Sequence, residues 1–251
     1  SSSETNMLPV EIIVNRALNL SKGQLKDSRD IEGVFNEARD LLEQGDNYLK
    51  EENLKRLQAL HNNIGLHFRS MGESDSAITE YNKAIDRYNI RRKVSPDDTE
   101  SYGIILFNLS VDLYTVGNFR DSKDTAAKAV KVFDELNKET EARILAERML
   151  SMARAKLDEN NQVTIEQIED SLNRMKTLYG EVHSSIADLL RLYARELVNK
   201  SPDQAEDYYR EAIGIYEKLS SSGTNEEFYG YQEIGGFLNH IDKFQEAEDA
   251  Y

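Results

Sequence analysis

The chain has 251 residues, no cysteine and a formal net charge of −15. The lack of cysteine excludes disulfide bonds, thiol nucleophiles and cysteine-ligated zinc, and the negative charge argues against a protein that binds a nucleic-acid phosphate backbone. No apolar run approaches the roughly 20 residues needed to span a membrane. With only three prolines and many Leu, Ala, Glu and Lys residues, the composition favours helix throughout.

No secretory signal pattern is present, so we expect a cytoplasmic protein. Since the chain begins at Ser1 and not at Met, we expect part of the native N-terminus to be missing. Residues 1–50 predict helices over 9–20 and 31–49. In the second of these, small and large apolar residues alternate at helical spacing. We interpret residues 1–50 as a helical cap or a degenerate repeat.

Two short amphipathic patterns follow, on either side of a turn predicted at Gly72. The first contains Gly65 and Phe68, and the second contains Ala77 and Tyr81. Small residues on both helices would let two antiparallel helices approach closely, with the aromatic rings filling the space beside them. This stretch predicts a helical hairpin, in which Gly65 faces Ala77.

A second hairpin is predicted after the sequence Ser-Pro-Asp at 95–97, which is typical of a helix start because proline needs no N–H at the first helical position. Its first helix carries leucines at 106, 109 and 113, and a turn is expected at Gly117. Ala126 and Ala129 mark its second helix.

The C-terminal half contains a helix predicted over 139–157, a polar loop at 158–162, and three segments that align without gaps. These segments begin at Gln167, Gln204 and Glu246. The last one ends with the chain, about two turns into a helix. We therefore expect a truncated final repeat, whose cut end frays or self-associates.

The first hairpin resembles a tetratricopeptide repeat (TPR), whose two helices carry the patterns Leu-Gly-x2-Tyr and Ala-x3-Phe-x2-Ala. The small packing residues Gly65, Ser110, Ala153, Ala194 and Gly235 are 45, 43, 41 and 41 residues apart. The basic TPR is about 34 residues long, so the chain resembles the long-repeat group that includes kinesin light chains and the Rap-type peptide-sensing regulators. The resemblance implies an all-α, right-handed α-solenoid of antiparallel helix pairs, with about five repeats over residues 51–251.

In TPR arrays the first helix of each repeat lines a concave groove, so the resemblance implies a binding surface. Asn63 and Asn108 occupy equivalent positions, and a ladder of amides can hold an extended peptide backbone. Alternatively, these amides bond between neighbouring helices or cap local backbone. The expected groove residues are Asn62, Asn63, Arg69, Phe107, Asn108, Tyr114, Arg148, Arg191, Arg195, Gln232 and Asn239.

Arg191 and Arg195 are four residues apart, so guanidinium groups on one helix face could hold a carboxylate. This is similar to the carboxylate clamp of chaperone-binding TPR domains, although the clamp uses asparagine where this chain has Leu66 and Val111. The alternative is a salt bridge from Arg191 to Asp188 or Glu196.

Residues for catalysis, metal binding or cofactor binding are not grouped in the sequence. No two of the four histidines share a short metal-binding spacing, and no strand precedes Gly235-Gly236, as a phosphate loop would need. We therefore expect no enzyme activity and no cofactor. The sequence predicts a scaffold or adaptor that binds a protein or peptide, with a basic partner suited to its charge and no role for nucleic acid. The alternative is a peptide-gated regulatory domain of a larger signalling protein or enzyme.

Overall fold

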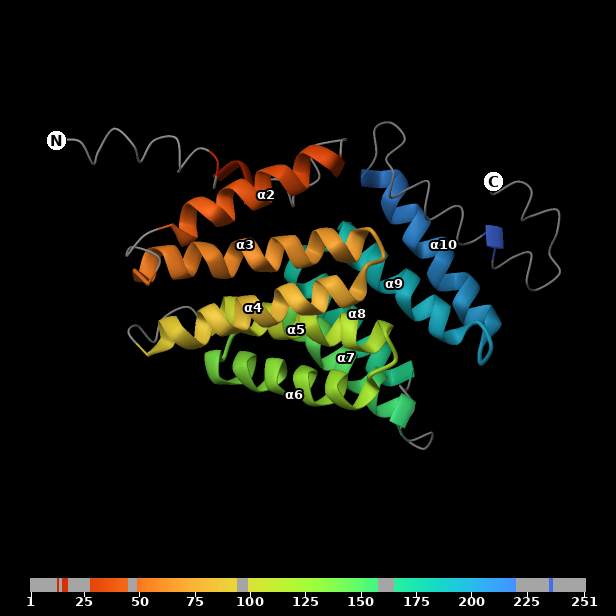
Figure 1. The fold of residues 1–251 in the computed structure, drawn as a ribbon. Coiled ribbons are helices and arrows are strands. Elements are labelled where there is room, and N and C mark those ends of the chain that lie inside the picture. The colour runs from red at the N-terminus through yellow and green to blue at the C-terminus, as the bar shows by residue number, and fades with distance from the viewer. Residues whose placement is uncertain are drawn as a thin grey trace. The chain divides into compact units, whose positions relative to one another are not determined.

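The computed structural model describes residues 13, 15–17, 28–44, 49–93, 99–157, 165–219 and 235–236. Within those ranges the secondary structure is helical and contains no strand (Figure 1). The chain divides into two compact units, Ser1–Gln162 and Val163–Tyr251. We describe each unit by itself.

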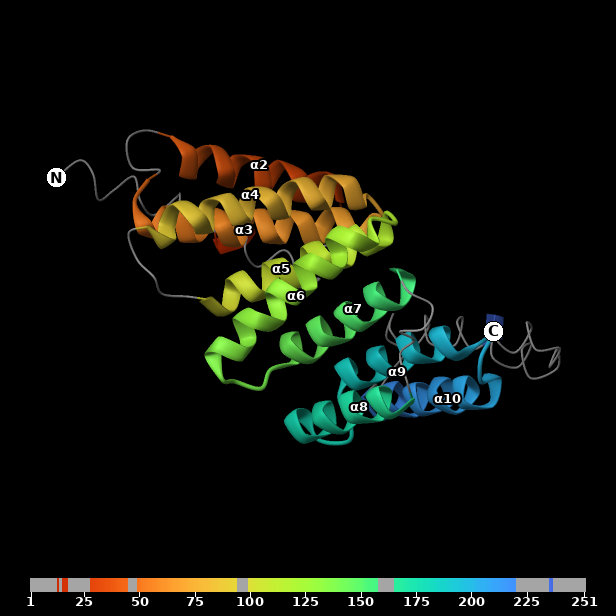
Figure 2. The same ribbon diagram turned by 90° about the horizontal axis from the view of Figure 1, so that it is seen from below.

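The first unit contains two tightly packed helix pairs and further helices on either side of them (Figure 2). Helix α3 packs against α4, and α5 packs against α6. Helix α2 packs on α3, and α7 packs on both α5 and α6. The bounds are α2 Ser28–Glu43, α3 Glu51–Ser70, α4 Ser74–Arg92, α5 Thr99–Thr115, α6 Phe119–Leu136 and α7 Glu141–Leu157.

The second unit contains α8 (Ile165–Tyr179), α9 (Ser184–Leu197) and α10 (Pro202–Leu219). Helix α9 packs against both α8 and α10. The helix predicted over 139–157, observed as α7, and the first of the three aligned segments, which lies in α8, thus belong to different units. The antiparallel helix pairs and the all-α solenoid fold predicted from the sequence are confirmed.

The turns that close the first two hairpins lie at the predicted glycines. Gly72 has φ of 78° and Gly117 has φ of 82°, a left-handed conformation that residues with a Cβ rarely adopt. The amide of Gly72 donates to the carbonyl of Arg69 at 2.9 Å, which ends α3. The chain can therefore reverse within a few residues and bring α4 back along α3.

Gly65 allows the aromatic ring of Tyr81 to pack directly against the backbone of α3. A Cβ atom added at Gly65 would lie 2.5 Å from Cε1 of Tyr81, inside van der Waals contact. The side-chain atoms nearest to Gly65 across this interface are those of Tyr81, one turn along α4 from the predicted partner Ala77. Glycine makes room for a fully buried ring, because Tyr81 has an exposed fraction of 0%.

Several predicted boundaries differ from the observed ones. Helix α2 ends at Glu43, earlier than predicted, and α7 begins at Glu141. Helix α10 begins at Pro202, as the Ser-Pro pattern predicts. The equivalent Ser-Pro at 95–96, the loop at 158–162 and the final repeat except residues 235–236 lie outside the described residues.

Candidate partner-binding site

Polar side chains form a ladder between α3 and α5, the first helices of two successive repeats. Each pair joins residues that are 43 or 46 positions apart, close to the repeat length of the sequence. The three pairs are Gln58 with Ser101 at 2.7 Å, Asn62 with Asn108 at 2.9 Å, and Arg69 with Asp112 at 2.7 Å. The ladder fixes the register of the two helices and the positions of the polar groups along them.

Arg69 makes the most contacts in this ladder. Its Nε donates to Oδ2 of Asp112, and its Nη2 donates to the backbone carbonyl of Asn108. The guanidinium carbon also lies 5.3 Å from the centre of the Tyr81 ring, a cation–π geometry. The Asp112 side chain is 1% exposed and that of Arg69 is 27% exposed, so one side of the arginine still faces solvent.

Tyr81 lies beneath Arg69 and remains neutral. Burial raises the pKa of its hydroxyl, the charge of Arg69 lowers it, and the charge of Asp112 raises it further. Burial is the largest of these effects because it disfavours the ionised phenolate. Tyr81 therefore contributes an aromatic surface and no acid–base chemistry.

Helix α5 presents an unusually apolar surface next to the ladder. Its only charged residues are Glu100 and Asp112, and Asp112 is buried. A stripe of half-buried side chains follows helical spacing along α5, at i, i+3, i+7 and i+10. The stripe consists of Ile104, Phe107, Val111 and Tyr114. One side of Ile104 and of Phe107 packs against the core cluster that contains Phe133 of α6. A helix with apolar residues on nearly every side is normally covered by other elements.

The structure brings several predicted groove residues together on α3 and α5. Asn62 and Asn63 are half-buried on α3, whereas Asn108 is 5% exposed and donates to Asn62. This bond between neighbouring helices is the alternative role that the sequence left open for the amides. Phe107 and Tyr114 are half-buried on α5, where Tyr114 packs edge-on against a ring of α6.

Other predicted residues lie elsewhere. Arg148 is on α7 and is only 7% exposed. In the second unit, Nη1 of Arg191 donates to Asp188 and to the hydroxyl of Tyr216, which includes one of the two salt bridges considered from the sequence. Arg195 is exposed on the same helix, α9. Gln232 and Asn239 lie outside the described residues.

A buried polar cluster between α3 and α4 was missed from the sequence. Nδ1 of His61 lies 2.7 Å from Oε2 of Glu80, and Lys83 donates to Oε1 of Glu80 at 2.6 Å. Burial raises the pKa of Glu80, but the hydrogen bonds and charges of His61 and Lys83 outweigh it, so the net pKa is lowered. Asp112 was missed as well, although its 43-residue spacing from Arg69 matches the repeat period.

The described residues contain no group of three or more His, Asp and Glu side chains that could hold a metal ion. None of their helices is long and apolar enough to cross a membrane.

No family model matches the sequence, and no curated protein sequence matches it. BtubC (BKLC) from P. vanneervenii is similar in structure, with a TM-score of 0.62 at 16% identity over 94% of this chain and 87% of that one.

Two further solved structures are similar. A Rap protein complexed with Competence and Sporulation Factor has a TM-score of 0.65 at 14% identity, covering 97% of this chain and 74% of its own. A putative kinesin light chain from Podosopora anserina, built of nearly identical TPR-like repeats, has a TM-score of 0.55 at 14% identity over 78% of this chain and 92% of that one. At these identities the similarity concerns the fold.

Proposed function

We propose that this chain, which has the fold of TPR-type repeat proteins, is a protein-interaction scaffold or adaptor and has no catalytic role. It binds a peptide or partner segment on the face formed by α3 and α5. The observation that carries the proposal is the α5 stripe, because its half-buried apolar side chains lie beside a fixed polar ladder. Contiguous apolar patches on a protein surface mark interaction sites, and the parts of this stripe that remain accessible are the candidate patch.

The ladder supports the same proposal because it pre-orders the polar groups. Asn62 and Arg69 are held by contacts across the helix interface before any partner arrives. Binding therefore costs less free energy than it would if these side chains were mobile and had to be ordered on association. In this proposal Asn63, Phe107 and Tyr114 contact the partner directly, and Asn108 positions Asn62.

The proposal is tested with two matched valine substitutions in the same repeat. Val111 is half-buried on the α5 stripe, and Val130 is half-buried on α6. The tagged wild-type chain, Val111→Lys and Val130→Lys are used to capture partners from a lysate of the native cells, and captured proteins are identified by mass spectrometry. We expect at least one partner that binds wild type and Val130→Lys but is lost with Val111→Lys.

Retention of every partner by Val111→Lys would contradict this assignment of the face. Circular dichroism on both variants provides the folding control, since a charge at a half-buried site also affects stability. Asn63→Ala is a milder test of the same face.

A peptide-gated regulator is the second candidate. The similarity to a Rap protein solved in complex with Competence and Sporulation Factor favours it. A regulator would change shape when its ligand binds, whereas a scaffold would not. Small-angle scattering of the chain with and without the captured partner segment separates the two, because only gating changes the radius of gyration beyond the added mass.

A further inference from the structure

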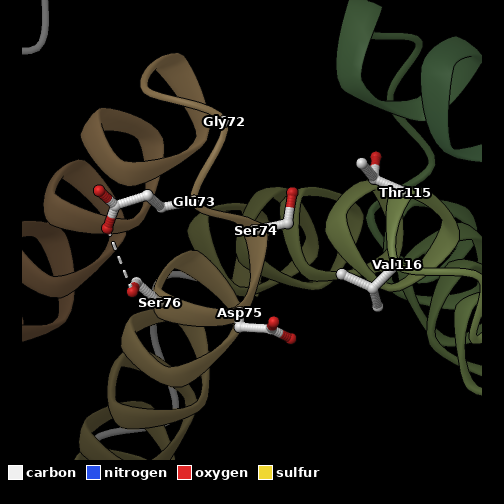
Figure 3. Close-up of a pocket in the computed structure, with 7 residues that line it drawn as sticks. All are labelled: Gly72, Glu73, Ser74, Asp75, Ser76, Thr115 and Val116. Atoms are coloured by element: carbon white, nitrogen blue, oxygen red, sulfur yellow. Dashed lines mark hydrogen bonds between the residues drawn. The ribbon is translucent and has the colours of Figure 1, made fainter.

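Two buried polar atoms without a hydrogen-bond partner among the described residues lie beside Arg69, in the core of the first unit. They are the hydroxyl oxygen of Tyr81 and Oδ1 of Asp112. An open pocket of about 410 Å³, shown in Figure 3, lies where α4 begins and α5 ends, and none of the described residues that line it has such an atom. The unsatisfied polar groups therefore lie in the core and not in this surface pocket.

The Tyr81 hydroxyl and Oδ1 of Asp112 lack opposite halves of a hydrogen bond. Burial is the main cause of the raised pKa of Tyr81, so its hydroxyl keeps its proton and can donate. Nε and Nη2 of Arg69 both contact Oδ2 of Asp112, which leaves Oδ1 as a charged acceptor without a donor. A buried polar atom in this state costs free energy, and a charged one costs more.

Both groups contact the same guanidinium. The Cζ atom of Arg69 lies 5.3 Å from the centre of the Tyr81 ring, and its Nε lies 2.7 Å from Oδ2 of Asp112. After burial, the charges of Arg69 and Asp112 are the further causes that shift the pKa of the Tyr81 hydroxyl, so the carboxylate lies near it. The two oxygens are nevertheless too far apart for a direct hydrogen bond, since neither has a partner.

Packing prevents the two oxygens from closing this gap. The Tyr81 ring lies against the backbone of α3 at Gly65, where an added Cβ would be 2.5 Å from Cε1 of the ring. The Asp112 carboxylate is held by its ion pair with Arg69 and is 1% exposed. Protein interiors are packed so closely that a side chain shifts only when its neighbours shift too. A third group is therefore needed to join the two oxygens.

We propose that the first unit binds one ordered water molecule between Tyr81, Asp112 and Arg69. The water accepts from the Tyr81 hydroxyl and donates to Oδ1 of Asp112. It also accepts from Nη1 of Arg69, whose hydrogen bond to Oδ1 of Asn108 is long, at 3.4 Å. Buried waters typically make about three hydrogen bonds to groups that would otherwise be unsatisfied.

This water site joins α3, α4 and α5, because each helix contributes one of its three partners. It therefore connects the buried ring of the first hairpin to the ion pair between successive repeats. The site goes beyond the proposed interaction role and does not depend on it.

A crystal structure of the wild-type chain, at a resolution that shows ordered water, tests the site directly. We expect density for a water at about 2.7–3.2 Å from the Tyr81 hydroxyl, from Oδ1 of Asp112 and from Nη1 of Arg69. A direct bond between Tyr81 and Asp112, or a gap without density, would overturn the proposal.

Tyr81→Phe tests the site in solution, because the sign of its effect depends on the water. If the water is bound, the variant loses a hydrogen bond, and the folding equilibrium constant should fall about fivefold. If it is not, the change removes an unpaired buried hydroxyl, and the constant should stay the same or rise. Urea unfolding followed by circular dichroism measures the constant and shows that the near-isosteric variant folds.

Tyr88→Phe is the matched control, since it makes the same change two turns further along α4. Tyr88 is 2% exposed, but its hydroxyl is not one of the buried atoms without a partner. We expect its folding equilibrium constant to stay close to that of wild type. An equal fall in both variants would mean that the loss at Tyr81 has no specific connection with Asp112, and the water site would be rejected.

Discussion

Arg69 and Asp112 form a hydrogen-bonded ion pair between two successive repeats, with Nε 2.7 Å from Oδ2. The carboxylate is 1% exposed, while the arginine retains 27% exposure. Removing the arginine should therefore cost more free energy of unfolding than removing the carboxylate, since a buried charge without its partner is far more costly than an exposed one. This asymmetry leads to the first prediction.

Arg69→Ala should destabilise the first unit more than Asp112→Asn does. The first change leaves a buried carboxylate unpaired, at a cost of about 3 kcal/mol, whereas the second leaves a partly exposed arginine that water can solvate. Urea unfolding of both single variants and of the double variant measures the difference. Equal losses for the two single variants would contradict the unequal dependence.

Gly65→Ala should lower the free energy of unfolding by about 1–3 kcal/mol, because the new methyl group overlaps the Tyr81 ring. Gly33→Ala is the matched control in α2, where an added Cβ meets nothing within 4 Å. It should stabilise the chain by up to ~1 kcal/mol, the difference in helix propensity between the two residues. Thermal unfolding of both variants checks the prediction, which fails if the two shift in the same direction.

The lowered pKa of Glu80 predicts a loss of stability in acid. A carboxylate with a lower pKa in the folded state stabilises the fold above the unfolded pKa, and this contribution is lost as pH falls through the folded pKa. The unfolded reference value is 4.5, so the contribution is complete at neutral pH. Chemical unfolding at a series of pH values should show a smaller acid-side loss for Glu80→Gln than for wild type. Parallel curves would show that His61 and Lys83 do not stabilise the ionised form.

Tyr216→Phe should destabilise the second unit by about 1 kcal/mol. Its hydroxyl donates to Asp188 and accepts from Arg191, and all three groups lie at the interface of α9 and α10. Tyr208→Phe is the control, since that half-buried tyrosine lies on the same helix and shows no hydrogen bond among the described residues. Hydrogen exchange of α9 amides should rise in the first variant alone.

The fold could be predicted from local patterns because the sequence of each hairpin contains its own turn glycine and its own small packing residues. Gly72 and Gly117 mark turns that need positive φ, and the spacing of the small residues gives the repeat length. The division between α7 and α8 could not be predicted, since nothing in either helix sequence indicates that they belong to different units.

The candidate site could be predicted only in outline. Repeat register predicted Asn62, Arg69 and Asn108 as groove residues, and in the structure they bond one another between α3 and α5. The repeat spacing alone does not show whether an asparagine side chain faces solvent or bonds the neighbouring helix. That depends on the rotation of α5 about its own axis. The pairing of His61 with Glu80 depends on the exact approach of α3 and α4, which composition and spacing leave open.

The apolar character of α5 also has a consequence for biosynthesis. While α5 emerges from the ribosome, its core-facing side is exposed until α6 has been made and has packed against it. An apolar segment with few charges is prone to aggregate in such an interval. A chain that stops at residue 115 should therefore collect in inclusion bodies, whereas one that continues to residue 157 should remain in solution.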